Sequence, residues 1–290
     1  MIPSSFATSK SIIMKTLQEA IFFKEEGKGG AGRSLRKHLA AVGINEWGDI
    51  TRSTLYDFRD HLTGTLAPGT ARTIMAYAKA LLNRYSDEVN FPKDWKAILS
   101  AKNVRPMKTY LTESELAQFA DAPVHTHKQI LVKNLFLICA YTGLRVSDAM
   151  NLSTENIVDG NLHYVARKTK KAGAIPLKKG LEERIAWVAG HKDLTITLKS
   201  YNQAVRKMAK DAGINDEVVV LKAGHEMRGP KWMFLSSHTA RISTATCLSR
   251  RGVSVGDICK VLQHSGTAMT ERYIIRDRVE LSETAMAFFS

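Results

Sequence analysis

Six side chains in the 290-residue chain could act together on a phosphodiester. They comprise two arginines, two histidines, one lysine and one tyrosine: Arg145, Lys168, His238, Arg241, His264 and Tyr273. A phosphoryl transition state carries negative charge on its non-bridging oxygens, and a guanidinium group is shaped to donate two hydrogen bonds to them. A tyrosine oxygen can form a covalent ester, and a lysine or histidine can give a proton to the leaving alkoxide. The set predicts covalent phosphodiester transfer.

The spacing of these residues supports a common site. His238 precedes Arg241 by one helical turn, so both side chains project from the same helix face. His264 follows Arg241 by 23 residues and precedes Tyr273 by nine. Each residue alone also has an ordinary structural explanation, since arginines cover surfaces and tyrosines pack. Lys168 lies in an expected hairpin turn, where lysine is common.

The sequence indicates neither a metal ion nor a nucleotide cofactor. It shows no carboxylate cluster for magnesium and no glycine-rich phosphate loop. Cys139, Cys247 and Cys259 stand in apolar contexts without metal-ligand spacing. We expect buried free thiols in a reducing cytoplasm.

The charge balance indicates a polyanionic partner. Lys and Arg number 42 against 28 Asp and Glu, which leaves a net charge of +14. Residues 167–210 hold twelve Lys or Arg and three Asp or Glu. Such density favours nucleic acid, although a solvated basic face is the alternative for this stripe. Acidic membranes are a rival partner, but no apolar run approaches the roughly 20 residues that span a bilayer. The first residues also lack the apolar core of a signal peptide.

Two domains should position the six residues. Residues 1–100 have helical periodicity over four segments, 9–26, 33–44, 51–64 and 67–89. Gly43 is placed to end the second helix and Pro68 to begin the fourth.

A basic stretch follows the helical domain. Residues 93–108 read as a strap across the DNA backbone, with 101–110 as the linker between the domains. Lys102, Arg105 and Lys108 would contact phosphates there. A solvated linker is the alternative.

Residues 111–290 should form an α+β catalytic domain. A capping box at Thr112 and Glu115 starts a helix, and residues 128–143 form a strongly apolar one. The alternating residues favour a small antiparallel meander, and more helices follow. Its strands are expected at 157–158, 162–167 and 172–177, and the later helices at 181–190, 197–214 and 238–252. Residues 218–222 and 231–235 could form a further strand pair. The fold class is therefore mainly α with a small antiparallel sheet.

Several motifs together resemble the catalytic domain of the tyrosine recombinases, or phage integrase family. They are "TGLRVSD", the lysine of "RKTKKAGAIPL", "HTAR", "LQH" and the final Tyr273. "KWMFLSSHTAR" resembles integrases of Bacteroidetes mobile elements. The first hundred residues are similar to the SAM-like core-binding domain of the two-domain members, which form a C-shaped DNA clamp. The chain departs from the family at Gln263, where glycine is common, and at Ile242, where histidine is frequent.

The resemblance implies a site-specific recombinase that cleaves and rejoins DNA through a 3′-phosphotyrosyl intermediate without metal or ATP. Tyr273 would be the nucleophile, while Arg145 and Arg241 would hold the phosphate. His264 would donate a hydrogen bond to the phosphate, and His238 would act as general base.

The proton donor to the 5′-oxygen would be Lys168. Lys170 and Lys171 are close enough in the same turn to be alternatives, and otherwise they would bind DNA.

The resemblance also implies double-stranded DNA as partner and a homotetramer on two sites. The C-terminal tail after Tyr273 would be exchanged between protomers, unless its apolar residues fold back on their own domain. Accessory DNA-bending proteins and a nucleoid-associated place in the cytoplasm of a bacterial or phage-infected cell would be typical. A type IB topoisomerase and a non-catalytic DNA-binding regulator remain alternatives on the same fold.

Overall fold

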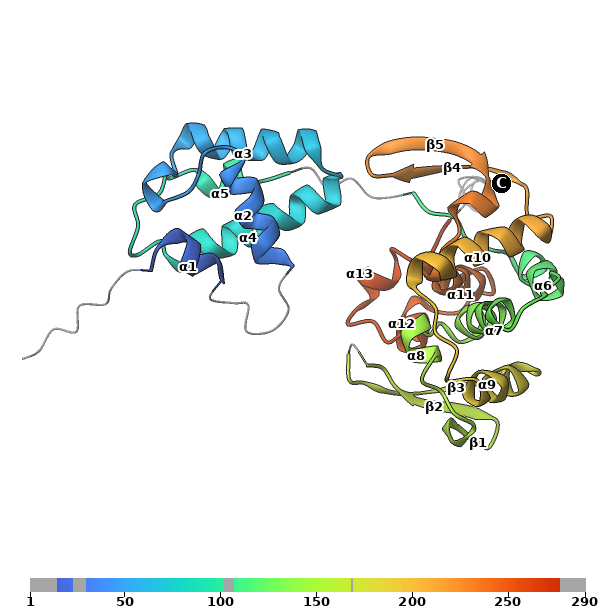
Figure 1. The fold of residues 1–290 in the computed structure, drawn as a ribbon. Coiled ribbons are helices and arrows are strands. Elements are labelled where there is room, and N and C mark those ends of the chain that lie inside the picture. Colours follow the sequence, from blue (N-terminus) through green and yellow to red (C-terminus); the bar gives the residue numbers. More distant parts are fainter. Residues whose placement is uncertain (1–14, 23–29, 102–106, 168, 277–290) are drawn as a thin grey trace, which may run out of the picture. The chain divides into compact units, whose positions relative to one another are not determined.

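The computed structural model describes four stretches of the chain: 15–22, 30–101, 107–167 and 169–276. The chain divides into two compact units, Met1–Pro106 with Ala223–His225, and Met107–Lys222 with Glu226–Ser290. Figure 1 shows helices in the first unit, and helices with two small sheets in the second. The expected fold class, mainly α with small antiparallel sheets, is confirmed.

The first unit is helical in its described part. Its helices are α1 (Leu17–Phe22), α2 (Ala31–Ala40), α3 (Arg52–Thr65), α4 (Pro68–Arg84) and α5 (Trp95–Ile98). Helix α3 begins where the Thr51 hydroxyl accepts a hydrogen bond from the Thr54 amide, and α4 begins with Pro68, whose missing N–H costs nothing there. Leu55 and Phe58, on one face of α3, are buried in the apolar core.

Helix α5 corrects the expected strap. Trp95, Ile98 and Leu99 are buried in the core of the first unit, so these residues do not form a strap. In the sequence, the surrounding basic residues hid the apolar spacing of these three side chains. Their burial depends on packing with the neighbouring helices of the first unit. Lys102 and Arg105 lie outside the described residues.

The second unit is built around α7 (His127–Thr142), which is buried along most of its length because its sequence is apolar on nearly every face. The capping box is confirmed on α6 (Glu113–Asp121): the Thr112 hydroxyl accepts from the Glu115 amide and the Glu115 carboxylate accepts from the Thr112 amide. The remaining helices are α8 (Val146–Ala149), α9 (Leu181–Gly190), α10 (Leu198–Asp211), α11 (Ser237–Arg250), α12 (Val255–Leu262) and α13 (Thr267–Thr270).

The expected meander is confirmed. Its strands β1 (Ile157–Val158), β2 (Asn161–Val165) and β3 (Ala172–Pro176) pair in that order and run antiparallel. Leu162 of β2 lies opposite Ile175 of β3, and both face the core. The alternation of buried and exposed residues along β2 reflects its period of two.

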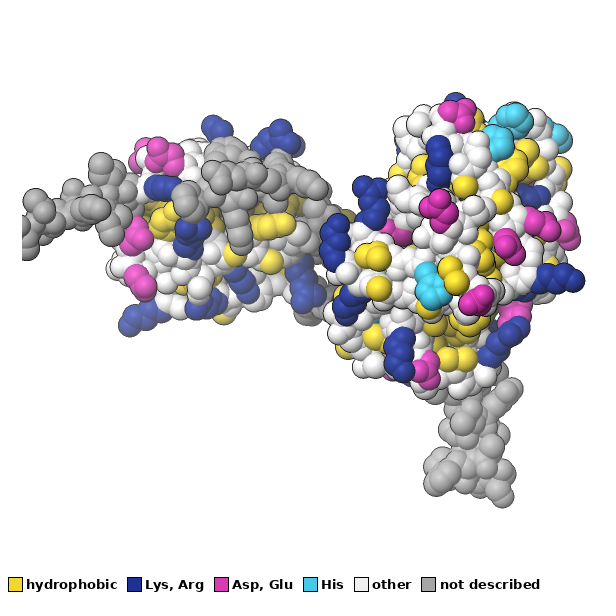
Figure 2. Space-filling view, turned by 90° about the horizontal axis from the view of Figure 1, so that it is seen from below, with side chains coloured by type: hydrophobic (Ala, Val, Ile, Leu, Met, Phe, Trp, Pro, Cys, Tyr) yellow, Lys and Arg dark blue, Asp and Glu magenta, His cyan; other side chains and the backbone are white. Residues whose placement is uncertain are grey.

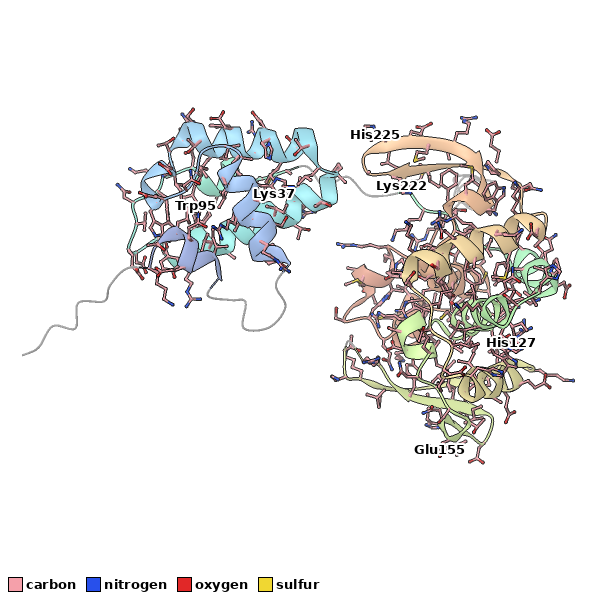
Figure 3. All side chains as sticks on the ribbon, in the orientation of Figure 1. Lys37, Trp95, His127, Glu155, Lys222 and His225 are labelled. Carbon is pink, nitrogen blue, oxygen red and sulfur yellow. The ribbon has the colours of Figure 1, made fainter. Side chains whose placement is uncertain are left out.

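The second strand pair differs from the expectation. Strand β4 (Glu217–Lys222) pairs with β5 (His225–Pro230), while residues 231–234 form the 3-10 helix η3. Ala223 and Gly224 both have positive φ, as in a two-residue hairpin turn, so the chain reverses at once. Figure 3 labels Lys222 and His225 at the ends of this turn. In Figure 1 this hairpin and the meander lie at opposite ends of the second unit, with helices between them.

The three cysteines are free, but they are not all buried as expected. Cys139 is buried inside α7, whereas Cys247 and Cys259 are only partly covered. None of the helices in the described stretches is long and apolar enough to cross a membrane.

Candidate active site

Arg241 is the centre of the site. It projects from the start of the second turn of α11 and is only 3% exposed. Its Nη1 donates to the Gly143 carbonyl, and its Nη2 donates to the Leu262 carbonyl over 2.8 Å. Nη2 also lies 3.2 Å from Nε2 of His264. The guanidinium group thus joins the ends of α7 and α12, while its buried Nε has no partner among the described residues.

Gly143 is required by two constraints at the end of α7. Its φ of +71° is in the left-handed region, and a Cβ there would approach Cδ2 of Leu262 to 2.7 Å. This explains the glycine of "TGLR": the backbone must turn sharply while its carbonyl faces Arg241.

His264 is held in one neutral tautomer. Arginine can only donate, so Nε2 of His264 accepts from Arg241, and Nδ1 carries the proton toward Oγ1 of Thr270 at 3.0 Å. Burial, followed by the charges of Arg241, Arg145 and His238, lowers the pKa of His264 to about 4. The ring is therefore neutral at pH 7.

Tyr273 lies between the two histidine rings. Its ring centroid is 4.8 Å from that of His238, in an edge-on arrangement, and 4.6 Å from that of His264. The Thr246 hydroxyl donates to the Tyr273 carbonyl and accepts from the Ile275 amide. These bonds attach the segment after α13 to α11, so the tyrosine ring faces the first turn of that helix.

A further cation, Lys108, faces the Tyr273 ring together with Arg241. Nζ of Lys108 lies 5.3 Å from the Tyr273 ring centroid, and Cζ of Arg241 lies 5.8 Å from it. Burial and the nearby Arg272 lower the pKa of Lys108. Burial and the Arg145 charge lower the pKa of Arg241.

His238 is an exposed residue and also responds to these cations. Partial burial, then the charges of Lys108, Arg241 and Arg145, lower its pKa to about 4. A neutral imidazole beside Tyr273 is able to accept a proton.

Arg145 occupies the start of α8 and remains partly exposed. Its Nη1 lies 3.9 Å from Oδ2 of the buried Asp148. The other oxygen of Asp148 accepts a hydrogen bond from the Arg167 amide, at the end of β2. Asp148 therefore connects the arginine to the meander.

The structure thus brings together five of the six residues from the sequence: Arg145, His238, Arg241, His264 and Tyr273. Lys168 lies outside the described residues, whereas Lys170 and Lys171 are exposed in the turn between β2 and β3. Among the residues that the structure describes, no group of three His, Cys, Asp or Glu side chains is arranged to hold a metal ion.

Two contributing residues were missed. Asp148 follows Arg145 by three positions, and that spacing within "LRVSD" is a usable signal. Thr270 has no comparable sequence signal, because only the fold of α13 places it beside His264.

Comparisons with known proteins agree with this geometry. Residues 109–278 match the model of the phage integrase family. Tyrosine recombinase XerD of Chlorobaculum tepidum is 28% identical over 245 residues, which are 79% of this chain and 77% of that protein. A lambda integrase dimer bound to a COC′ core site has a TM-score of 0.63 at 18% identity, covering 91% of this chain and 97% of the other. A lambda integrase tetramer bound to a Holliday junction has a TM-score of 0.62 at 16% identity, covering 92% and 80%.

The fold and the clustered side chains are those of a tyrosine recombinase catalytic domain. Because the family match spans more than half of the sequence, the chain belongs to the phage integrase family. It is a site-specific recombinase, and the resemblance inferred from the motifs is confirmed.

Proposed function

We propose that the protein cleaves and rejoins DNA through a 3′-phosphotyrosyl intermediate, with Tyr273 as nucleophile and without metal or ATP. The observation that supports this most is the convergence of Tyr273 with Arg241, His238 and His264. These residues come from α11, the end of α12 and the segment after α13. A shared task on a phosphodiester accounts for the meeting of a buried arginine, two neutral histidines and a tyrosine at one place.

The charge of the site favours a phosphate. Besides burial, the charge of Arg145 helps to lower the pKa of Arg241. The charges of Lys108 and both arginines likewise add to burial in lowering the pKa of His238. Among these cations, the carboxylate of Asp148 forms an ion pair with Arg145 alone, at 3.9 Å, and its other oxygen accepts from a backbone amide. A phosphodiester between the arginines would relieve the repulsion and accept hydrogen bonds from guanidinium N–H groups. It would also raise the pKa of His238, which would become a better base when DNA is bound.

The reaction balances with groups of this chain. His238 takes the proton of the Tyr273 hydroxyl as the phenolic oxygen attacks phosphorus. The bond from phosphorus to the 5′-oxygen breaks, and Lys168 gives that oxygen a proton. Rejoining is the reverse, so bond energy is conserved in the tyrosyl ester and no ATP is needed.

His264 would contribute in a second tautomer. In the DNA-free site its Nε2 accepts from Arg241. If Thr270 donates its hydroxyl proton to Nδ1 instead, Nε2 carries a hydrogen that can be donated to the phosphate. Movement of Arg241 toward the phosphate would free that nitrogen.

Trapping the covalent complex tests the reaction. A duplex with the correct site and a nick that lets the cleaved end diffuse away should give a DNA–protein adduct, equally with and without EDTA. Tyr273→Phe should bind the site normally and form none. An adduct from Tyr273→Phe, or a strict requirement for Mg²⁺, contradicts the proposal.

The proton donor has its own test. Lys168→Ala should slow cleavage by about 10²-fold or more, and a substrate with sulfur at the 5′-bridging position should restore most of the rate. Lys170→Ala and Lys171→Ala are the matched controls. Rescue of either control instead would move the assignment to that lysine.

The DNA-bound assembly is part of the proposal. The domains would be residues 1–100 and 111–290, joined by 101–110, and would close on double-stranded DNA as a C-shaped clamp. The lambda integrase tetramer on a Holliday junction supports a homotetramer on two sites. Relatives from a bacterium and a phage support a place in the cytoplasm of a bacterial or phage-infected cell.

The exchanged tail would lie within the last residues, and 277–290 are outside those the structure describes. Truncation after Arg278 should leave half-site binding intact and abolish cooperative filling of the full site in gel-shift titrations. Cooperative filling by the truncated protein would rule out the exchange.

A further inference from the structure

Gln263 has an unusual conformation beside the site. It follows the last residue of α12 with φ 50° and ψ 43°, in the left-handed region that side chains other than glycine rarely adopt. Its two neighbours both bind Arg241, Leu262 through its carbonyl and His264 through its ring. A change in the backbone here would therefore move two contacts of the central arginine.

The side chain of Gln263 is buried without satisfying its polar atoms. The residue is 6% exposed, and neither Oε1 nor Nε2 of its amide has a hydrogen-bond partner among the described residues. A buried amide without partners is destabilising. Hydrogen bonding therefore does not explain why a glutamine stands at this position. The remaining explanation is the volume that its side chain fills.

That volume fills the space between α12 and the meander. A Cβ placed on Gly173 of β3 would lie 2.2 Å from Nε2 of Gln263 and 3.2 Å from Cζ of Tyr164. The amide thus lies directly against the backbone of β3, and a side chain at position 173 would require the amide or the strand to shift. Nearby, the Tyr164 hydroxyl donates to the Val261 carbonyl over 3.3 Å, a second connection between the sheet and α12.

We propose that Gln263 is a positioning residue, a spacer that sets the distance between the His264 end of α12 and the β2–β3 hairpin. This inference rests on the proposed function, because the hairpin turn carries the lysines from which the leaving 5′-oxygen would be protonated. The spacer holds that turn in register with Arg241 and His264.

The first test separates volume from hydrogen bonding. Gln263→Met keeps the volume and removes both polar atoms, so its cleavage rate should stay within about threefold of the wild type and its Tm should not fall. Gln263→Gly suits the backbone but removes the spacer, and it should slow cleavage by about tenfold or more. The loss should be much smaller with 5′-bridging sulfur, because that leaving group needs no proton. Equal losses for Met and Gly would overturn the spacer role, as would a wild-type rate for Gly.

The second test asks whether Gln263 and Gly173 act on each other. Gly173→Ala should reduce the cleavage rate and Tm, because the amide or the strand must move. In the double variant Gly173→Ala/Gln263→Gly, the added methyl group fits the space that the glutamine side chain leaves. Gln263→Gly should therefore reduce the cleavage rate and Tm less in the Gly173→Ala background than in the wild type. If the losses of rate and Tm from the two single substitutions simply add in the double variant, the proposed contact between Gln263 and Gly173 is wrong. Tm measures the coupling between the two positions even in variants that do not cleave DNA.

The two proposals fail in different ways. If the wild type forms no tyrosyl adduct, the proposed function fails while the coupling in Tm can still be found. If the adduct forms but Gln263→Gly cleaves both substrates normally, only the spacer inference fails. Half-site affinity confirms that each variant is folded.

Discussion

In the helical unit, His38 is the one buried polar side chain among the residues that the structure describes, and it is paired with His61 across 3.0 Å. The described part of the second unit buries fourteen polar or charged side chains. Several follow one another along α11, including Arg241, Ser243 and Thr244. Both units are helical and carry exposed cations on the face shown in Figure 2, so composition does not separate them.

The difference lies in where each unit places its charge. The described core of the first unit is almost entirely apolar, and its cations lie outside that core. The second unit buries the cations Lys231 and Arg241 and the imidazole of His264, which is unfavourable unless each is held by partners. The Thr244 hydroxyl, for example, donates to the Ala140 carbonyl and so ties α11 to α7.

The largest expected effect is on the cleavage rate, when substitution of a buried arginine is compared with substitution of one at the surface. Arg241→Lys keeps the charge but cannot reach three acceptors at once, so single-turnover cleavage should fall about 10³-fold. Arg59 of the first unit pairs with Asp60 on the surface, and Arg59→Lys should stay within about threefold. Similar losses at both positions would erase the contrast between the units.

A buried ion pair in the second unit tests the same difference between the units through the free energy of unfolding. Nζ of Lys231 lies 2.5 Å from Oε1 of Glu115, and both side chains are about nine-tenths buried. Lys231→Met leaves a buried unpaired carboxylate and should lower the free energy of unfolding by about 3–5 kcal/mol. Lys231→Met/Glu115→Gln should recover most of it in urea titrations.

The matched surface pair belongs to the first unit. Arg52 and Asp94 are 3.0 Å apart and largely exposed, so Arg52→Met should lower the free energy of unfolding far less than Lys231→Met does. A cost equal to that of Lys231→Met would show that burial does not decide the effect.

The histidines make stability depend on pH. The folded-state pKa values of His238 and His264, about 4, lie below the ordinary value of 6.5, so the unfolded chain binds more protons between these pH values. Their contribution is complete above pH 6.5 and is lost as the pH falls toward 4. His264→Asn should flatten this dependence in urea midpoints measured from pH 7 to 4.

The stability of the first unit should also fall as the pH is lowered from 7 to 4, but by a smaller amount. Burial, the neighbouring His61 and Lys37 lower the pKa of His38. Hydrogen exchange from pH 7 to 4 follows each unit separately. A steeper loss of protection in the first unit would contradict the order expected here.

The smallest effect concerns salt. Replacing Lys102, Arg105 and Lys108 together by glutamine should flatten the dependence of log affinity on log salt by about 0.9 for each phosphate that the protein no longer neutralises. An unchanged slope in gel shifts would show that none of the three binds a phosphate and would return Lys102 and Arg105 to the solvated-linker alternative.

Local patterns in the sequence predicted much of the fold. The capping box at Thr112, the apolar run of α7 and the alternation along β2 each depend on neighbouring residues, and each is confirmed. The pairing of β4 was predicted with the wrong partner. Its tight turn contains Ala223, a residue that gives no sign of positive φ.

The chemistry of the motifs likewise predicted which residues gather at the site, but not which tautomer each histidine adopts. A histidine near Arg241 was expected to donate to phosphate, but the sequence cannot show that Nε2 of His264 accepts from that arginine. The partners that decide the tautomer come from α11 and α13.

Sequence by itself determined the family, the helices and strands that depend on local periodicity, and the identity of the clustered side chains. Tertiary structure alone decided that Trp95 fills a core, that Thr270 orients His264, and that the amide of Gln263 lies against Gly173. Periodicity and spacing act over a few residues of chain. Burial, tautomers and close contacts depend on segments that are distant in sequence and meet only in the folded protein.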